Sequence, residues 1–168
     1  MDEVIIVEYD PRWPILFEQE AAQIWQVLGK DLVVAIEHIG STAVPGLAAK
    51  PIIDLMVGVN SLLIARAAVP LLETIGYVYW RENPHPGRMF FVKGMPPFGV
   101  QRTHHLHIVE AYGEFWQRLL FRDYLRSHPL EAQRYEALKR DLAKRFHSDR
   151  ESYTNGKSEY IQSVMEKA

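Results

Sequence analysis

Cysteine is absent from the 168 residues of this chain. Its absence excludes disulfide bonds, thiolate zinc sites, iron–sulfur clusters and a cysteine nucleophile. Any metal chemistry therefore has to use the seven histidines and the carboxylates. Long apolar runs are missing too, because the stretches near Ile52–Val59 and Leu62–Leu72 are too short or too interrupted to span a bilayer. Met1–Glu3 is acidic and lacks the basic start of a signal peptide, so we expect a cytoplasmic protein without a membrane partner.

An excess of either charge is also lacking. Lys and Arg number 19 against 21 Asp and Glu, which gives a formal net charge of −2. This balance argues against binding to bulk nucleic acid, although it allows a small basic pocket for a phosphorylated ligand. The composition, 48% hydrophobic and 24% charged, is that of an ordinary globular protein. The length predicts a single domain over residues 1–168, and the oligomeric state stays open.

Strand and helix patterns alternate along the first two thirds of the chain, and the last third is helical. The predicted strands are Val4–Val7, Leu32–Ile39, Ile52–Val59, Tyr77–Trp80, Arg88–Lys93 and Thr103–Val109. The predicted helices are Pro14–Leu28, Ser61–Ile75, Glu114–Ser127, Pro129–His147 and Arg150–Lys167. This order predicts an α/β (α+β) fold with a mixed sheet over about residues 1–110 and a C-terminal helical cap over about residues 113–168. We expect Leu32–Ile39 and Ile52–Val59 to be neighbours and the cap to pack against the sheet.

A glycine-serine turn, Gly40–Ser41, follows the second predicted strand, and Thr42 adds another hydroxyl. Gly40 allows a ligand to approach the backbone closely, and successive N–H groups in such a turn can hold phosphate oxygens. A tight turn without a ligand is the structural alternative. The segment is not a Walker A loop, because Gly46 lies one residue too far from Gly40 and Lys50 does not directly follow Gly46.

Asp54 interrupts an otherwise apolar strand. A carboxylate is costly to bury there unless it is paired or binds a metal, which favours a functional role over a structural one. His105 and His107 share one face of a later strand, because side chains alternate along a strand. We predict that Asp54, His105 and His107 hold a divalent metal, with Mn²⁺ or Zn²⁺ favoured over Mg²⁺. A histidine-rich solvent-facing strand is the alternative.

Three further residues are candidates for contact with an anion. His38 and Lys50 flank the loop that contains the glycine-serine turn. Lys157 lies on the apolar stripe of the last helix, four residues after Tyr153. A lysine in that position either reaches an anion or extends its ammonium group to solvent.

The segment from His38 to Asp54 resembles the signature of the GrpB family. Tyr9–Pro14 resembles the opening of that family, and Thr103–His107 resembles its histidine-rich strand. Phe121–Arg126 and Tyr153–Ser158 resemble its helical end, so that the resemblance covers nearly the whole chain.

The GrpB family is similar to the nucleotidyltransferase fold, which implies a nucleoside triphosphate substrate and a divalent metal. By this resemblance Gly40–Ser41 matches the turn that binds the triphosphate, and Asp54 matches the first of the metal-binding carboxylates. Met56 stands at the second carboxylate position and cannot bind Mg²⁺, while the strand expected to carry the third has His105 and His107. These departures argue against ordinary transfer with two Mg²⁺ ions.

Three functions remain open at this point. The first is an enzyme that transfers a nucleoside monophosphate or a phosphoryl group to a small acceptor, with Asp54, His105 and His107 as its catalytic residues. The second is a non-catalytic module that binds a nucleotide or cofactor, because such domains also resemble an extension of some dephospho-coenzyme A kinases. The third is a metal-dependent hydrolase with a metal-bound water.

Overall fold

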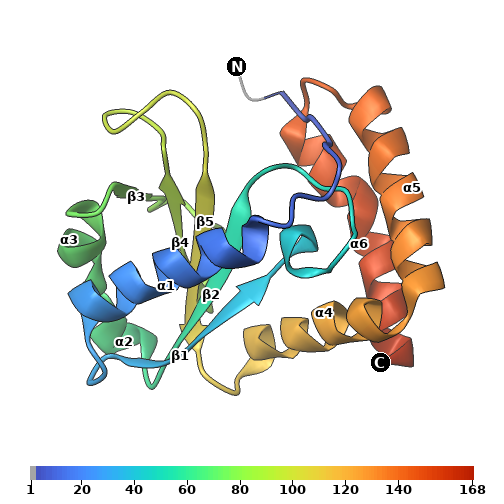
Figure 1. Ribbon diagram of the computed structural model, residues 1–168. Coiled ribbons are helices and arrows are strands. Elements are labelled where there is room, and N and C mark those ends of the chain that lie inside the picture. The colour runs from blue at the N-terminus through green and yellow to red at the C-terminus, as the bar shows by residue number, and fades with distance from the viewer. Residues whose placement is uncertain (1–2) are drawn as a thin grey trace.

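The computed structural model describes residues 3–168, which fold around a five-stranded mixed sheet (Figure 1). β1 (Val33–Ile39) is antiparallel to β2 (Ile53–Val59), and β2 is parallel to β5 (His104–Glu110). β5 is antiparallel to β4 (Arg88–Lys93), which pairs antiparallel with the edge strand β3 (Tyr77–Tyr79). The strand order β1-β2-β5-β4-β3 confirms the mixed sheet and the pairing of the first two long strands.

One face of the sheet is covered by α1 (Trp13–Leu28) (Figure 1). Pro14 in the first turn presets the helical φ, and Gly29 ends the helix with a φ of 78°. The short helix α3 (Ala68–Glu73) packs against α1 and β3. Alternate residues of β2 and β5 point toward α1 and form the main core, namely Ile53, Leu55, Val57, Leu106 and Ile108. The residues between them therefore point to the second face.

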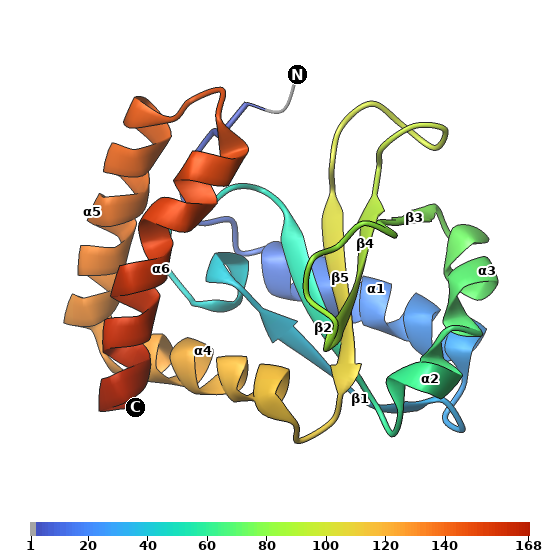
Figure 2. The same cartoon turned by 180° about the vertical axis from the view of Figure 1, so that it is seen from behind.

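The C-terminal third is helical, as predicted, and lies beside and below the sheet in Figure 2. It consists of the 3₁₀ turn η2 (Glu114–Gln117) and the helices α4 (Arg118–Ser127), α5 (Pro129–Arg145) and α6 (Arg150–Lys167). Within residues 3–168, none of the helices combines the length and the apolar character that crossing a bilayer requires.

The cap packs on the second face of the sheet only through its first part. There Phe115 and Trp116 contact a small cluster formed by Ile39, Met56 and Val109. α5 and α6 pack instead on the loop between β1 and β2 and on the N-terminal segment, through Val44, Leu47, Tyr135, Val4, Leu142 and Tyr153. The expectation that the whole cap packs against the sheet therefore holds for its first part alone.

The predicted strand Val4–Val7 does not belong to the sheet. Val7 forms an isolated bridge with Ala49, with N–H···O distances of 2.9 and 3.0 Å in the two directions. Val4 N–H donates to the carbonyl of His147 at 2.8 Å. The segment thus bonds to the β1–β2 loop and to the chain just after α5. Its β-branched residues favour an extended backbone, but that backbone pairs with no strand of the sheet.

The predicted helix Ser61–Ile75 is two short helices, α2 (Leu62–Ala65) and α3. A continuous helix would require Pro70 to donate a hydrogen bond to the carbonyl of Arg66, and proline has no N–H. The chain restarts its helix so that Pro70 falls in the first turn of α3, where no such donor is needed.

Candidate functional site

Asp54, His105 and His107 lie together on the second face of the sheet. Asp54 is the register partner of His105 in the parallel β2–β5 pair, and His107 lies two residues further along the same face. The Nδ1 atom of His105 is 3.4 Å from Asp54 Oδ1, and the Nε2 atom of His107 is 3.5 Å from the same oxygen. The alternation inferred from the sequence therefore places all three side chains in one cluster.

Arginine side chains fix the protonation of both rings. The Nη1 atom of Arg88 is 3.3 Å from His107 Nδ1, and that of Arg102 is 3.3 Å from His105 Nε2. A guanidinium group can only donate, so these ring nitrogens accept, and the opposite nitrogens carry the protons that point to Asp54. Burial lowers the pKa of His107 to about 4 and lowers that of His105, so both rings are neutral near pH 7.

The same arrangement keeps Asp54 ionised. Burial alone would raise the pKa of its carboxyl group, but the hydrogen bonds from His105 and His107 outweigh burial and hold that pKa well below its usual range. The carboxylate is partly open, with 27% of its side chain exposed.

These hydrogen bonds do not fit the predicted metal centre. Among the described residues 3–168, no group of three His, Cys, Asp or Glu side chains is arranged to hold a metal ion. The ring nitrogens that face Asp54 carry protons, and the lone pairs of His105 and His107 point to arginines. A metal ligand must offer a lone pair, so in this arrangement the three residues form a hydrogen-bonded cluster, and the metal site stays a prediction.

The glycine-serine turn lies directly against this cluster. A Cβ atom on Gly40 would lie 2.6 Å from Asp54 Oδ2, and Gly40 has a φ of 75°. Only glycine permits both the close approach and this conformation without strain. Ser41 begins the 3₁₀ turn η1 (Ser41–Ala43), so the structure brings the predicted turn and Asp54 together.

His38 and Thr42, both predicted to contact an anion, are turned away from Asp54. The His38 ring stacks on Phe17 of α1 with a centroid distance of 4.8 Å, and its Nε2 lies 2.8 Å from the Thr42 hydroxyl. His38 pairs with Leu55, whose side chain points to the α1 face, so its own side chain lies on that face too. For these two residues the anion-binding prediction is corrected to a structural contact.

Burial lowers the pKa of His38 to about 4, from 6.5 when the ring is solvated. Its contribution to stability is full above pH 6.5 and is lost as the pH falls toward 4, because only the unfolded chain then binds the proton. Denaturant titrations across this window should show a loss of about 3 kcal/mol from this residue. In His38→Gln the pH dependence should flatten, while Thr42→Val, which keeps the buried ring, should retain it. An unchanged slope in His38→Gln contradicts this assignment.

Lys50 and Lys157 meet over one buried ring. Their ammonium nitrogens lie 4.8 and 4.7 Å from the centroid of Tyr153, which is fully buried. Burial and then the charges of Lys157 and Arg150 lower the pKa of Lys50 to about 7, whereas Asp54 acts in the opposite direction. The two lysines predicted from the sequence therefore lie together, and Lys50 also interacts electrostatically with Asp54.

Arg88 and Arg118 complete the cationic surroundings of Asp54 and were not identified from the sequence. Burial and the charge of Arg118 lower the pKa of Arg88 to about 10, and Asp54 partly offsets this shift. Burial likewise lowers the pKa of Arg118, against the effect of Asp54. Both guanidinium groups lie near the ring of Phe115, at 5.9 and 5.3 Å from its centroid.

The helical cap holds the loop that carries the turn. Arg126 Nε donates to the carbonyl of Ala43 at 2.9 Å, which fixes the end of η1. The N–H of Ala48 donates to Glu136 at 2.8 Å, and Lys139, only 1% exposed, donates to the Ala48 carbonyl at 2.6 Å. α4 and α5 therefore shape the site by binding its backbone, which explains why they pack on the loop.

Comparison with known proteins places the chain in a family, because the GrpB protein family matches residues 3–167. The chain belongs to the GrpB family. It is 47% identical to a UPF0157 protein of Pseudomonas aeruginosa, over 99% of this chain and 68% of that protein. It is 36% identical to the glutamate-rich protein GrpB of Alkalihalophilus pseudofirmus, over 97% of this chain and 94% of that protein.

A solved GrpB structure has the same fold as this chain. The crystal structure of GrpB from Enterococcus faecalis matches it with a TM-score of 0.87 and 38% sequence identity, over 97% of this chain and 96% of that one. More distantly, 98% of this GrpB-family chain is 27% identical to a segment of a dephospho-CoA kinase of Mycolicibacterium paratuberculosis, of which the match covers 46%.

Proposed function

We propose that this GrpB-family protein binds a nucleotide through its phosphate groups, at the cationic pocket around Asp54. The observation that carries the proposal is a group of cations near a single carboxylate: Asp54 acts electrostatically on Lys50, Arg88 and Arg118, and Lys157 lies beside Lys50 over the Tyr153 ring. Burial lowers the pKa of Lys50, Arg88 and Arg118, and repulsion by neighbouring cations lowers the pKa of Lys50 and Arg88 further. A polyphosphate supplies the negative charge that offsets this repulsion, through charge-assisted hydrogen bonds.

The turn beside Asp54 is the second part of the proposed site. Gly40 has no side chain, so the Asp54 carboxylate lies directly against the turn, and the turn's backbone stays within reach of a ligand bound beside that carboxylate. The resemblance of the family to nucleotidyltransferases supports a nucleotide rather than free phosphate as the ligand. The similarity to part of a dephospho-CoA kinase also connects domains of this type with the chemistry of phosphorylated compounds.

Binding without transfer agrees best with the residues of the site. Met56 occupies the second carboxylate position, and it is 1% exposed within the cluster of Ile39 and Val109. The hydrogen bonds of Asp54, His105 and His107 favour binding that does not depend on a metal held by these residues. Of the three functions left open by the sequence, the proposal is therefore the non-catalytic nucleotide-binding module.

Calorimetric titration of inorganic tripolyphosphate and of ATP tests the proposal. Both should bind in the presence of EDTA, because the protein's own cations provide the attraction. Lys50→Gln should lower both affinities about tenfold, the effect of losing about 1.4 kcal/mol of charge interaction. Lys144→Gln removes an exposed lysine of α5 and should leave both affinities within about twofold of wild type. Absence of binding by either ligand, or equal losses in the two variants, refutes the proposal.

A further inference from the structure

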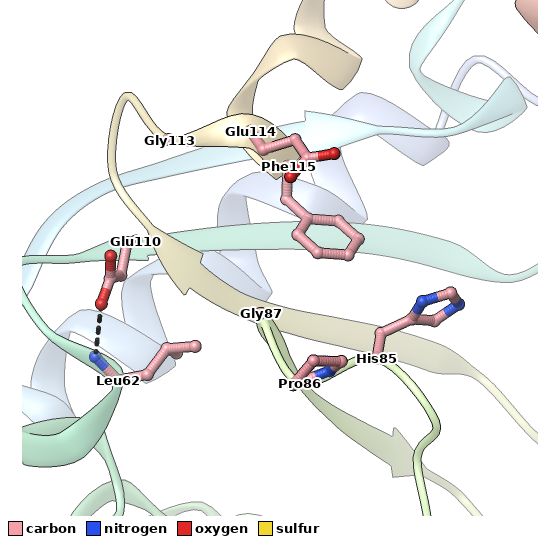
Figure 3. Close-up of a pocket in the computed structure, with 8 residues that line it drawn as sticks. All are labelled: Leu62, His85, Pro86, Gly87, Glu110, Gly113, Glu114 and Phe115. Carbon is pink, nitrogen blue, oxygen red and sulfur yellow. Dashed lines mark hydrogen bonds between the residues drawn. The ribbon is translucent and has the colours of Figure 1, made fainter.

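A cavity opens near the same face of the sheet, at the end of β5 away from Asp54. It has a volume of about 550 Å³, which is within the range of small-molecule sites. Figure 3 shows Phe115 on one side of it and Pro86 opposite, with Glu110 and His85 at its two ends. Leu62 at the start of α2 closes a further side, so the cavity is built by three separate segments of the chain.

The cavity adjoins the proposed phosphate site across a single side chain. Phe115 lines the cavity, and the guanidinium groups of Arg88 and Arg118 lie over the same ring, at 5.9 and 5.3 Å from its centroid. Arg88 in turn contacts His107 in the Asp54 cluster. Glu110 lies five positions beyond His105 on β5, which is about 16 Å at ~3.3 Å per residue. A nucleotide with its phosphates near Asp54 can therefore extend its base toward the cavity.

The walls of the cavity suit a flat ring. Phe115 and His85 lie with their ring centroids 5.9 Å apart and an interplanar angle of 73°, so their faces are not stacked on each other. Pro86 and Leu62 add apolar surface. The Phe115 ring is already packed against Arg88 and Arg118, so the exposed ring of His85 is the face that would stack on a base. Aromatic faces stack on every nucleobase, so this contact supplies attraction without selecting which base binds.

The polar groups at the edge of the cavity would make that selection. Glu110 and Glu114 line it, and both are exposed at its edge. Glu110 Oε1 accepts only a long bond, 3.4 Å, from the backbone N–H of Leu62. Ionised carboxylates accept hydrogen bonds and donate none, so they favour the base with the most donors on one edge. Guanine presents a ring N–H and an amino group side by side.

We propose that this cavity binds the base of the nucleotide whose phosphates lie near Asp54, and that Glu110 and Glu114 select guanine. The inference rests on the proposed nucleotide binding and extends it by naming the base. The charge pattern agrees with one ligand that spans both parts: lysines and arginines surround the phosphate end, and carboxylates lie at the base end.

Calorimetric titration should compare GTP, inosine triphosphate, ATP, UTP and inorganic tripolyphosphate. We expect GTP to bind at least tenfold more tightly than tripolyphosphate, and inosine triphosphate, which lacks the amino group, to bind several-fold more weakly than GTP. Glu110→Gln combined with Glu114→Gln should remove the preference for GTP over ATP. The matched control, Glu18→Gln combined with Glu73→Gln, removes two exposed carboxylates elsewhere and should keep it. Because the loss of negative charge alters all polyanion affinities, the ratio of GTP to tripolyphosphate is the quantity to compare.

A second variant tests the cavity itself. Leu62→Trp fills part of it and should reduce the affinity for GTP to that for tripolyphosphate, with tripolyphosphate binding unchanged. If all nucleotides and tripolyphosphate bind equally well, this inference is wrong while the proposed phosphate site stands. A preference for ATP or UTP also overturns it. So does a preference for GTP that persists both in the Glu110→Gln, Glu114→Gln double variant and in Leu62→Trp. If not even tripolyphosphate binds, the proposed function fails and this inference fails with it.

Discussion

Replacement of Gly40 by alanine is expected to abolish polyphosphate binding and to lower the free energy of unfolding by about 3 kcal/mol. The positive φ of 75° accounts for about 1–2 kcal/mol of this loss, because an L-residue is strained there. The remainder comes from the new Cβ, which would lie 2.6 Å from Asp54 Oδ2 and must displace the carboxylate or the turn. Displacing either one changes the positions of the cations that hold phosphate.

Gly46→Ala is the matched control for this substitution. Gly46 also has a positive φ, 80°, but its Cβ would meet nothing within 4 Å. The Gly46→Ala variant should be destabilised only by the backbone strain, and it should bind tripolyphosphate like wild type. Denaturant unfolding and calorimetry on both variants separate the two effects. Equal losses of affinity in the two variants would mean that the contact between Gly40 and Asp54 has no role in binding.

The sheet and its alternation could be predicted from local pattern. The strand patterns predicted all five strands of the sheet to within about one residue at each end, and the side chains of His105 and His107 lie on one face because the period of a strand is two. Asp54 was identified because a carboxylate in an apolar strand violates the pattern around it. The cluster of these three residues then followed from a single condition, that their strands are neighbours.

The cationic surroundings of Asp54 could not be predicted in the same way. Arg88 and Arg118 belong to β4 and α4, and no local signal distinguishes them from other arginines of the chain. Their position depends on the long-range pairing of β4 with β5 and on where η2 turns the chain back over the sheet. Electrostatic partners contributed by distant segments become visible only when the topology is known.

The side chain of His38 shows how a short-range pattern can fail at a strand end. Alternation correctly separates His38 from Glu37, but it does not tell which of the two shares a face with Asp54. That depends on the register of β1 with β2, in which Ile39 pairs with Asp54 and His38 with Leu55. Because a shift of one residue reverses the faces, the loop between the strands decides the outcome.

Asp54→Asn is expected to tighten the binding of tripolyphosphate about tenfold in the presence of EDTA. The substitution removes the one negative charge that opposes the ligand inside the cationic pocket, an interaction of roughly 1.4 kcal/mol at a separation near 6 Å and an effective dielectric of about 40. The free energy of unfolding should fall by about 1–3 kcal/mol, because His105 and His107 lose a charged acceptor for their hydrogen bonds. Stability and affinity are therefore expected to move in opposite directions.

The direction of that change distinguishes the two roles considered for Asp54. If the carboxylate held a divalent metal for the phosphates, its loss would weaken binding, and the weakening would be seen only with Mn²⁺ or Mg²⁺ present. Asp31→Asn removes an exposed carboxylate elsewhere and controls for the general gain in positive charge, which salt screens at the surface. Tighter binding by Asp54→Asn than by Asp31→Asn, with no dependence on added metal, identifies Asp54 as a charge that opposes the ligand and not as a metal ligand. Weaker binding that requires a metal would restore the metal site predicted from the sequence and overturn the metal-free pocket.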